Sequence, residues 1–94
     1  MKKITYFYIN GCPYCVNADR ARKELIEENA AYADVEFDKY EEFERKDISD
    51  QYDYQATPAM FIDDKLIYQA HLFEPYEETK AHVKDVMDQA LASA

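Results

Sequence analysis

The chain has 94 residues, of which 48% are apolar and 15% aromatic, and we expect residues 1–94 to fold as one domain with one modest core. Eleven basic against twenty acidic residues give a net charge of −9, which argues against nucleic-acid and anionic membrane partners. No apolar run approaches the roughly 18 residues needed to cross a bilayer.

The first half of the chain reads as strand, helix and strand. Residues 3–9 (KITYFYI) are apolar nearly throughout and rich in β-branched and aromatic side chains, which is typical of a central strand. Their apolar run of about six residues lacks a small-residue cleavage site, so we expect a strand rather than a signal peptide, and a cytoplasmic protein. Helical spacing then predicts a helix from about Pro13 to Asn29, with an apolar face of Tyr14, Ala18, Ala21 and Leu25. Residues 35–37 read as a short second strand.

The second half reads as a helix, a hairpin and a helix. The acidic segment 41–51 predicts an exposed helix anchored by Phe43, Ile48 and Tyr52. Residues 59–62 and 66–68 predict two strands around a tight turn at 63–65. The last helix opens at Glu74-Pro75 and has an apolar stripe of Tyr76, Thr79, Val83, Val86, Met87 and Ala90. The predicted order is βαβαββα, an α/β fold whose first two strands are parallel because the crossover is right-handed.

The only two cysteines and the only glycine lie together in Gly11-Cys12-Pro13-Tyr14-Cys15. Gly11 permits the turn from strand to helix. Cys12 then falls at a helix N-terminus, where unpaired backbone N–H groups and the helix dipole stabilise a thiolate. Cys15, one turn into the helix, is within disulfide reach of Cys12 but more covered. We therefore expect Cys12 to attack a disulfide and Cys15 to resolve the mixed disulfide.

A C-x-x-C pair between a strand and a helix indicates redox chemistry more strongly than the pair alone. Half of a zinc site needs two further ligands, and His71 and His82 are the only candidates, so no metal site is predicted. A bridge between cysteines this close in sequence stabilises the fold little, because chain entropy rewards long loops. Two other functions stay open: a redox-sensing or binding module without turnover, and an iron–sulfur carrier using Cys12 and glutathione.

Thr57-Pro58 immediately precedes the predicted third strand. Proline cannot donate to a strand ladder, so it belongs at the beginning or edge of a strand. A cis bond there would expose the Thr57 backbone to an incoming peptide or thiol, but only ~5–6% of X–Pro bonds are cis, so local sequence favours trans.

With Cys12-Pro13-Tyr14-Cys15, Thr57-Pro58 and Phe61-Ile62-Asp63, the sequence resembles the glutaredoxins of the thioredoxin-like superfamily over nearly its whole length. The resemblance implies a thioredoxin-like fold, with a four-stranded mixed sheet flanked by helices and a cis Thr57-Pro58 bond. It also implies a thiol–disulfide oxidoreductase that acts on protein or small-molecule disulfides. Its implied site consists of the catalytic Cys12 and Cys15 and the substrate-binding Pro13, Tyr14, Thr57 and Pro58. The implied electron donor is glutathione, as co-substrate, or a flavin-containing thioredoxin reductase.

Four positions depart from the glutaredoxin pattern. Where the family holds glutathione with a lysine, a Gly-Gly pair and an aspartate, this chain has Ile9, Tyr68-Gln69 and His71. Each lost charge-assisted contact is commonly worth ~1.5–3 kcal/mol, so we expect weak glutathione binding.

Other residues near the cysteines carry further expectations. The nearest basic side chain downstream of Cys12 is Arg20, about two turns along the helix, so the pKa of Cys12 should be lowered mainly by backbone amides. Tyr14 should lie beside the active site, whereas packing roles are favoured for Tyr54 and Tyr68. Both histidines should be exposed.

Overall fold

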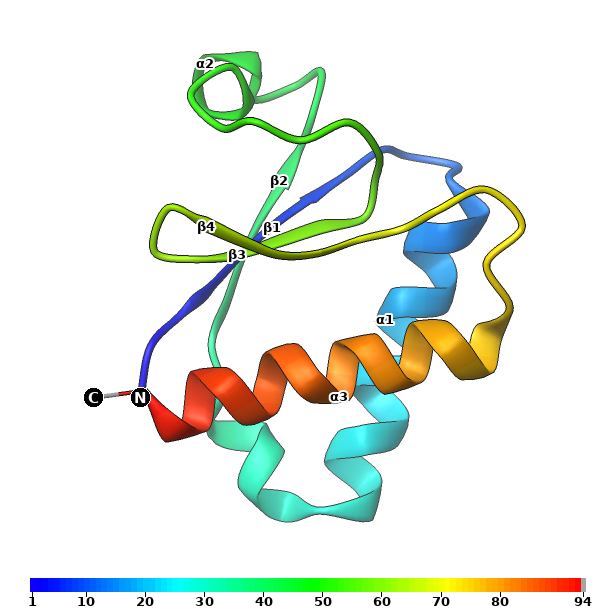
Figure 1. The fold of residues 1–94 in the computed structure, drawn as a ribbon, viewed down its shortest axis with the longest axis vertical. Helices are drawn as coiled ribbons and strands as arrows, with labels where there is room; N and C mark the ends of the chain where they lie inside the picture. Colours follow the sequence, from blue (N-terminus) through cyan, green and yellow to red (C-terminus); the bar gives the residue numbers. More distant parts are fainter. Residues whose placement is uncertain (94) are drawn as a thin grey trace.

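The computed structural model describes residues 1–93 and contains one four-stranded sheet of order β2-β1-β3-β4 (Figure 1). The elements are β1 (Ile4–Tyr8), α1 (Pro13–Glu28), the 3-10 helix η1 (Ala30–Asp34), β2 (Phe37–Glu41), α2 (Lys46–Ser49), β3 (Ala59–Ile62), β4 (Lys65–Gln69) and α3 (Tyr76–Ala92). Apart from η1, this is the predicted order. The thioredoxin-like α/β fold is therefore confirmed.

The sheet is mixed because β1 pairs with one parallel and one antiparallel strand. It runs parallel to β2, with Ile4 opposite Phe37, and antiparallel to β3, with Ile4 opposite Ile62. Strands β3 and β4 form the predicted hairpin, with a register irregularity between Met60 and Phe61. The apolar β1 is thus a central strand, as its composition predicts.

Two apolar clusters cover the two faces of the sheet. Helices α1 and α3 pack on one face, and the predicted α3 residues Thr79, Val83, Val86, Met87 and Ala90 are buried there. The other face carries an aromatic cluster, in which Phe7 stacks on Tyr54 at 5.1 Å between ring centroids and Tyr52 meets Phe61 at 4.9 Å. Alternate residues of β1 serve the two clusters, since strand side chains point to opposite faces.

The second strand lies later than predicted, at Phe37–Glu41 instead of residues 35–37. Asn29 accepts a hydrogen bond from the Ala31 amide and starts η1, which ends at the buried Val35. Val35 thus packs into the core as the end of a turn. The strand itself can carry charged residues because β2 is at the edge of the sheet.

The predicted exposed helix at 41–51 is wrong over most of its length. Only Lys46–Ser49 is helical, Glu41 belongs to β2, and Phe43 is 65% exposed and anchors nothing. The Glu41 carboxylate accepts the backbone N–H groups of Phe43 and Glu44, so the chain turns there without a helix. Ile48 packs against the aromatic cluster as predicted.

Both long helices agree with the prediction. Helix α1 ends one residue earlier than predicted, because Asn29 is the extended residue that caps it. Within residues 1–93, neither these helices nor α2 combines the length and the apolar character that crossing a membrane requires.

Candidate active site

The turn that leads to the cysteine pair depends on Gly11. Its φ of +81° lies in the left-handed region, which side chains with a Cβ rarely adopt. A Cβ built at Gly11 would meet no atom within 4 Å. The glycine is therefore required by the backbone conformation and not by lack of space.

Cys12 is the N-cap of α1 and is partly exposed. Its Sγ accepts the backbone N–H of Cys15 at 3.4 Å and lies 3.8 Å from both Oγ1 and the carbonyl oxygen of Thr57. Burial by itself would raise the pKa of the Cys12 thiol. Hydrogen bonds from Cys15, from the Thr57 hydroxyl and from the Tyr14 backbone outweigh burial, so this pKa is lowered.

Cys15 has the opposite properties. It is 3% exposed, and burial, followed by the hydrogen bond and charge of Cys12, raises its pKa to about 12. The two thiols are unbridged. The arrangement therefore favours ionisation of the Cys12 thiol over that of Cys15, which stays protonated behind it.

The first turn of α1 rests on a tyrosine of β1. The buried Tyr6 hydroxyl lies 3.2 Å from the carbonyl oxygen of Cys15 and 3.0 Å from a carboxylate oxygen of Asp19. Burial, reinforced by the charge of Asp19, holds the pKa of Tyr6 far above its ordinary value. Tyr6 thus stays neutral and fixes the position of the cysteine-bearing turn.

Glu41 is a site residue that the sequence analysis missed. It is 6% exposed, and its carboxylate accepts the Asn10 backbone N–H at 3.0 Å, which ties the segment before Cys12 to the end of β2. Hydrogen bonds from the backbone, that of Asn10 first, lower the pKa of Glu41. Nothing in the local sequence distinguishes this glutamate from the others in its acidic run. Parallel pairing with β1 sets Glu41 opposite Tyr8 and so brings it to the site.

The Thr57-Pro58 bond is cis, as the family resemblance implies and local sequence does not. Pro58 is buried and its carbonyl oxygen accepts the Ala70 N–H at 3.1 Å. Thr57 therefore faces Cys12 with its hydroxyl and its backbone, while Pro58 lies behind it.

A groove of about 370 Å³ runs beside Cys12. It is lined by Cys12, Pro13, Tyr14, Ala56, Thr57, Ala70, His71 and Leu72. Four of the six predicted site residues thus meet in one hollow, while Cys15 and Pro58 are buried outside its lining. Among residues 1–93, no lysine or arginine side chain contributes to this lining.

Among the positions that differ from the glutaredoxin pattern, only His71 has a side chain that can carry a positive charge, and that side chain is paired with Glu78. Tyr68 is buried and donates its hydroxyl hydrogen to Glu74, and the side-chain oxygen of Gln69 accepts the Gln55 N–H at 2.9 Å. His71 is exposed and its Nε2 lies 2.5 Å from a carboxylate oxygen of Glu78, whose hydrogen bond raises the pKa of the imidazole.

The other predicted positions agree with the structure. Tyr54 packs against Phe7, and Tyr68 belongs to the helix-side core, where its ring stacks on His82 at 5.0 Å. Both histidines are exposed. The predicted packing roles of Tyr54 and Tyr68 are therefore confirmed.

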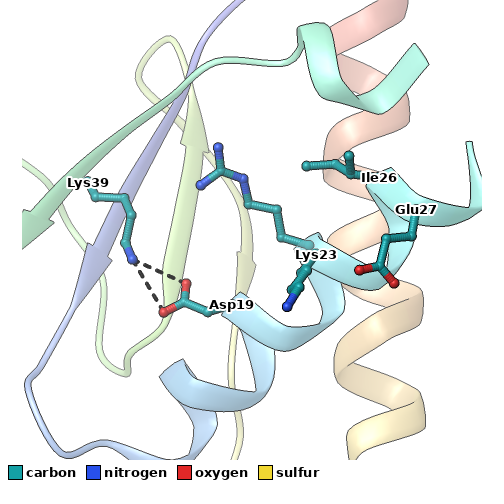
Figure 2. A pocket seen from close by; sticks show the side chains of 6 residues that line it. Asp19, Lys23, Ile26, Glu27 and Lys39 are labelled. Atoms are coloured by element: carbon teal, nitrogen blue, oxygen red, sulfur yellow. Dashed lines mark hydrogen bonds and ion pairs between the residues drawn. The ribbon is translucent and has the colours of Figure 1, made fainter. Parts of the chain in front are cut away.

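A second hollow, of about 530 Å³, lies between α1 and β2 (Figure 2). Lys39 reaches across it to both carboxylate oxygens of Asp19 at 3.3 Å, and the Arg22 guanidinium lies 4.1 Å above the Phe37 ring. It is lined by Asp19, Arg22, Lys23, Ile26, Glu27 and Lys39. None of these side chains carries a thiol, so both cysteines lie outside the lining of this hollow.

Comparisons with known proteins agree with this geometry. The sequence model of the family described as "Thioredoxin domain" matches residues 2–88. A solved structure entitled "Structure of a malarial protein" aligns with a TM-score of 0.56 over 88% of this chain and 93% of that one, at 12% identity. At such low identity, this second likeness supports the fold alone. No curated protein sequence matches the chain.

Proposed function

Because this chain belongs to the thioredoxin domain family, we propose that it is a thiol–disulfide oxidoreductase in which Cys12 is the nucleophile and Cys15 the resolving thiol. One observation carries this proposal: Cys12 lies partly exposed at the N-terminus of α1, where its Sγ accepts the Cys15 N–H, and the Cys15 thiol is buried one helical turn further on. The exposed thiol ionises readily, and the buried thiol does not compete with it for the substrate.

In the first step, the Cys12 thiolate attacks one sulfur of a substrate disulfide. A bond forms between Cys12 Sγ and that sulfur, the substrate S–S bond breaks, and the second substrate sulfur leaves as a thiolate that takes a proton from water. The Cys15 N–H and the Thr57 hydroxyl hold Cys12 Sγ in place for the attack.

In the second step, Cys15 attacks Cys12 Sγ and releases the other half of the substrate as a thiolate. Once Cys12 is in a mixed disulfide it is uncharged, so its charge no longer raises the pKa of Cys15. Cys15 then loses its proton to solvent more easily. The protein ends as a Cys12–Cys15 disulfide, and its two electrons reside in the two substrate thiols.

The groove favours a protein over glutathione as the electron donor that restores the dithiol. Glutathione carries two carboxylates, and the groove lining offers neither lysine nor arginine to pair with them. The net charge of −9 also repels anions. We propose a thioredoxin reductase as the donor, with glutathione a poor substitute.

The test is turnover of bis(2-hydroxyethyl) disulfide with two donor systems side by side: glutathione with its reductase, and thioredoxin reductase, each with NADPH. We expect faster turnover with thioredoxin reductase and loss of turnover in Cys12→Ser. Full activity of Cys12→Ser would refute the assignment of the nucleophile.

The same assay separates an enzyme from a redox-sensing module. A sensor would form the Cys12–Cys15 disulfide reversibly with oxidants and show no turnover with either donor. This outcome would overturn the proposed catalytic function while retaining the roles of the two thiols.

A further inference from the structure

We propose that His71, Glu74 and Glu78 bind a divalent transition-metal ion, of which zinc fits best. His82 supplies the fourth ligand. The ligand atoms of His71, Glu74 and Glu78 all lie within 4.8 Å of one another, in the β4–α3 loop and the first turn of α3 (Figure 1). The zinc site considered from the sequence joined the histidines to the cysteine pair, whereas this site joins them to glutamates and uses neither thiol. It is independent of the proposed oxidoreductase function.

The spacing of the ligand atoms fits tetrahedral coordination. His71 Nε2 lies 3.8 Å from Glu74 Oε1, and His82 Nε2 lies 3.4 Å from Glu78 Oε2. A zinc ion with nitrogen and oxygen ligands at ~2.0–2.1 Å separates these ligands by about 3.3 Å. The contact between His71 Nε2 and Glu78 Oε2, at 2.5 Å, is shorter and joins two solvent-accessible side chains, which can move apart to admit the ion.

The imidazole of His71 is already oriented for a metal. A carbonyl oxygen can only accept a hydrogen bond, so Nδ1 donates its hydrogen to the Leu72 carbonyl oxygen, 3.0 Å away. Nε2 faces the Glu78 carboxylate and carries the proton that a metal ion displaces on binding. Histidines that bind metals almost always donate their second N–H to a backbone carbonyl, a carboxylate or water, which fixes the orientation of the ring.

Glu74 is a buried carboxylate that points to a cation independently of the spacing. Its side chain is wholly buried, and its Oε2 accepts hydrogen bonds from the hydroxyls of Tyr68 and Thr79. Oε1 is the oxygen that lies toward His71, whose backbone N–H it accepts at 3.3 Å. Among residues 1–93, no lysine or arginine forms an ion pair with Glu74 or Glu78. Buried charges in proteins are paired or bind metals, so a metal ion at Oε1 supplies the charge that Glu74 lacks.

The types of ligand select the metal. Two imidazole nitrogens and two carboxylate oxygens suit zinc, whereas magnesium and calcium prefer oxygen ligands and copper(I) prefers sulfur. The net charge of −9 attracts cations to the chain. A bound ion joins the loop before α3 to the first two turns of that helix, so it should also stabilise the folded chain.

The experiment titrates Zn²⁺ into two forms of the chain that contain no free thiol and measures binding by calorimetry. The first form is the wild-type chain oxidised to its Cys12–Cys15 disulfide. The second is the double variant Cys12→Ser, Cys15→Ser, which serves if the disulfide does not form completely. We expect each form to bind one Zn²⁺ ion per chain, because the proposed ligands include neither cysteine.

Substitutions in the double variant then identify the ligands. His71→Gln, Glu78→Gln and His82→Gln should each raise the Kd for Zn²⁺ at least about tenfold, because even the loss of a group that only orients a ligand commonly costs ~10–100-fold. All three side chains are solvent-accessible, so these variants should fold. The matched control is Glu77→Gln, an exposed neighbour that loses the same charge as Glu78→Gln and should keep the Kd of its parent. Saturating Zn²⁺ should raise the melting temperature of the parent and of the control, but not that of His71→Gln.

Three results would overturn the site. Neither thiol-free form binds Zn²⁺ saturably, any of the three ligand variants keeps the Kd of its parent, or Glu77→Gln weakens binding as much as the ligand variants do. The last result would indicate diffuse attraction of the ion to an acidic surface. None of these measurements depends on turnover, so the metal site and the oxidoreductase function can fail separately.

Discussion

The loops that follow β1 and β4 lie at the same end of the sheet. They are built alike but carry different side chains. The loop from β1 to α1 contains Gly11 with φ +81°, and the loop from β4 to α3 contains Phe73 with φ +64°. A buried glutamate holds each loop: Glu41 accepts the Asn10 N–H, and Glu74 accepts the His71 N–H. The first loop ends in a thiol and the second in exposed apolar side chains.

The comparison teaches how a small fold holds two different turns by the same device. A carboxylate that accepts backbone N–H groups stabilises a turn which local hydrogen bonds would not close. Once the turn is held, its side chains are free for function. The first loop carries the proposed nucleophile and the second loop carries no thiol, so the following changes should affect the two loops differently.

The largest expected effect belongs to the reactive loop. Cys15→Ser should abolish turnover, because the mixed disulfide on Cys12 can no longer be resolved within the protein. The first step should persist, so the protein accumulates as a covalent adduct with one half of the substrate. Mass spectrometry under non-reducing conditions measures the adduct. Its absence, with turnover retained, would show that Cys15 is not the resolving thiol.

The second effect belongs to the loop between β4 and α3. The Glu74 carboxylate accepts hydrogen bonds from the hydroxyls of Tyr68 and Thr79 and from the His71 N–H. Glu74→Gln replaces one acceptor oxygen by a donor and leaves a buried group unsatisfied. The free energy of unfolding should fall by about 1–3 kcal/mol. Urea denaturation measures it, with the exposed Glu77→Gln as the matched control, and equal stability of the two variants would contradict the argument.

The third effect compares Gly11 and Phe73, the residues whose backbone has a left-handed conformation in these two loops. Gly11→Ala meets no steric clash but adopts an unfavourable φ, so it should cost about 1–2 kcal/mol of unfolding free energy. Phe73→Asn should have the opposite sign and stabilise the chain by less than about 1 kcal/mol, because asparagine tolerates this conformation better than phenylalanine. Thermal unfolding of both variants measures the difference. A stabilised Gly11→Ala would mean that the turn does not require the left-handed conformation.

The smallest effect is a pH dependence from Glu41. Backbone hydrogen bonds, that from Asn10 first, hold the folded pKa of Glu41 below its unfolded value. The stability that it contributes is thus present above the unfolded pKa and is lost as pH falls through the folded pKa. Glu41→Gln should flatten the acid limb of a stability–pH curve, whereas Glu44→Gln, in an exposed position, should leave the curve unchanged. If the stability of Glu41→Gln falls at acid pH as steeply as that of the wild-type chain, Glu41 does not contribute to the pH dependence.

The sequence by itself determined the parts that depend on neighbours a few positions apart. Helical spacing located α1 and α3, two short apolar runs around a tight turn located the β3–β4 hairpin, and the order of elements placed Cys12 at a helix N-terminus. The backbone part of the Cys12 pKa shift follows from this placement, because those N–H groups belong to its own helix, whereas the raised pKa of Cys15 comes first from burial.

Only the tertiary structure decided the contacts between segments distant in sequence. Glu41 reaches Asn10 across 31 positions, and Tyr14 reaches Phe73 across 59. An edge strand such as β2 takes its bounds from the strand it pairs with, so residues 35–37 were a wrong prediction for it. A glutamate in an acidic run looks like any other until a neighbouring strand buries it, since burial is a property of the packed chain and not of the local sequence.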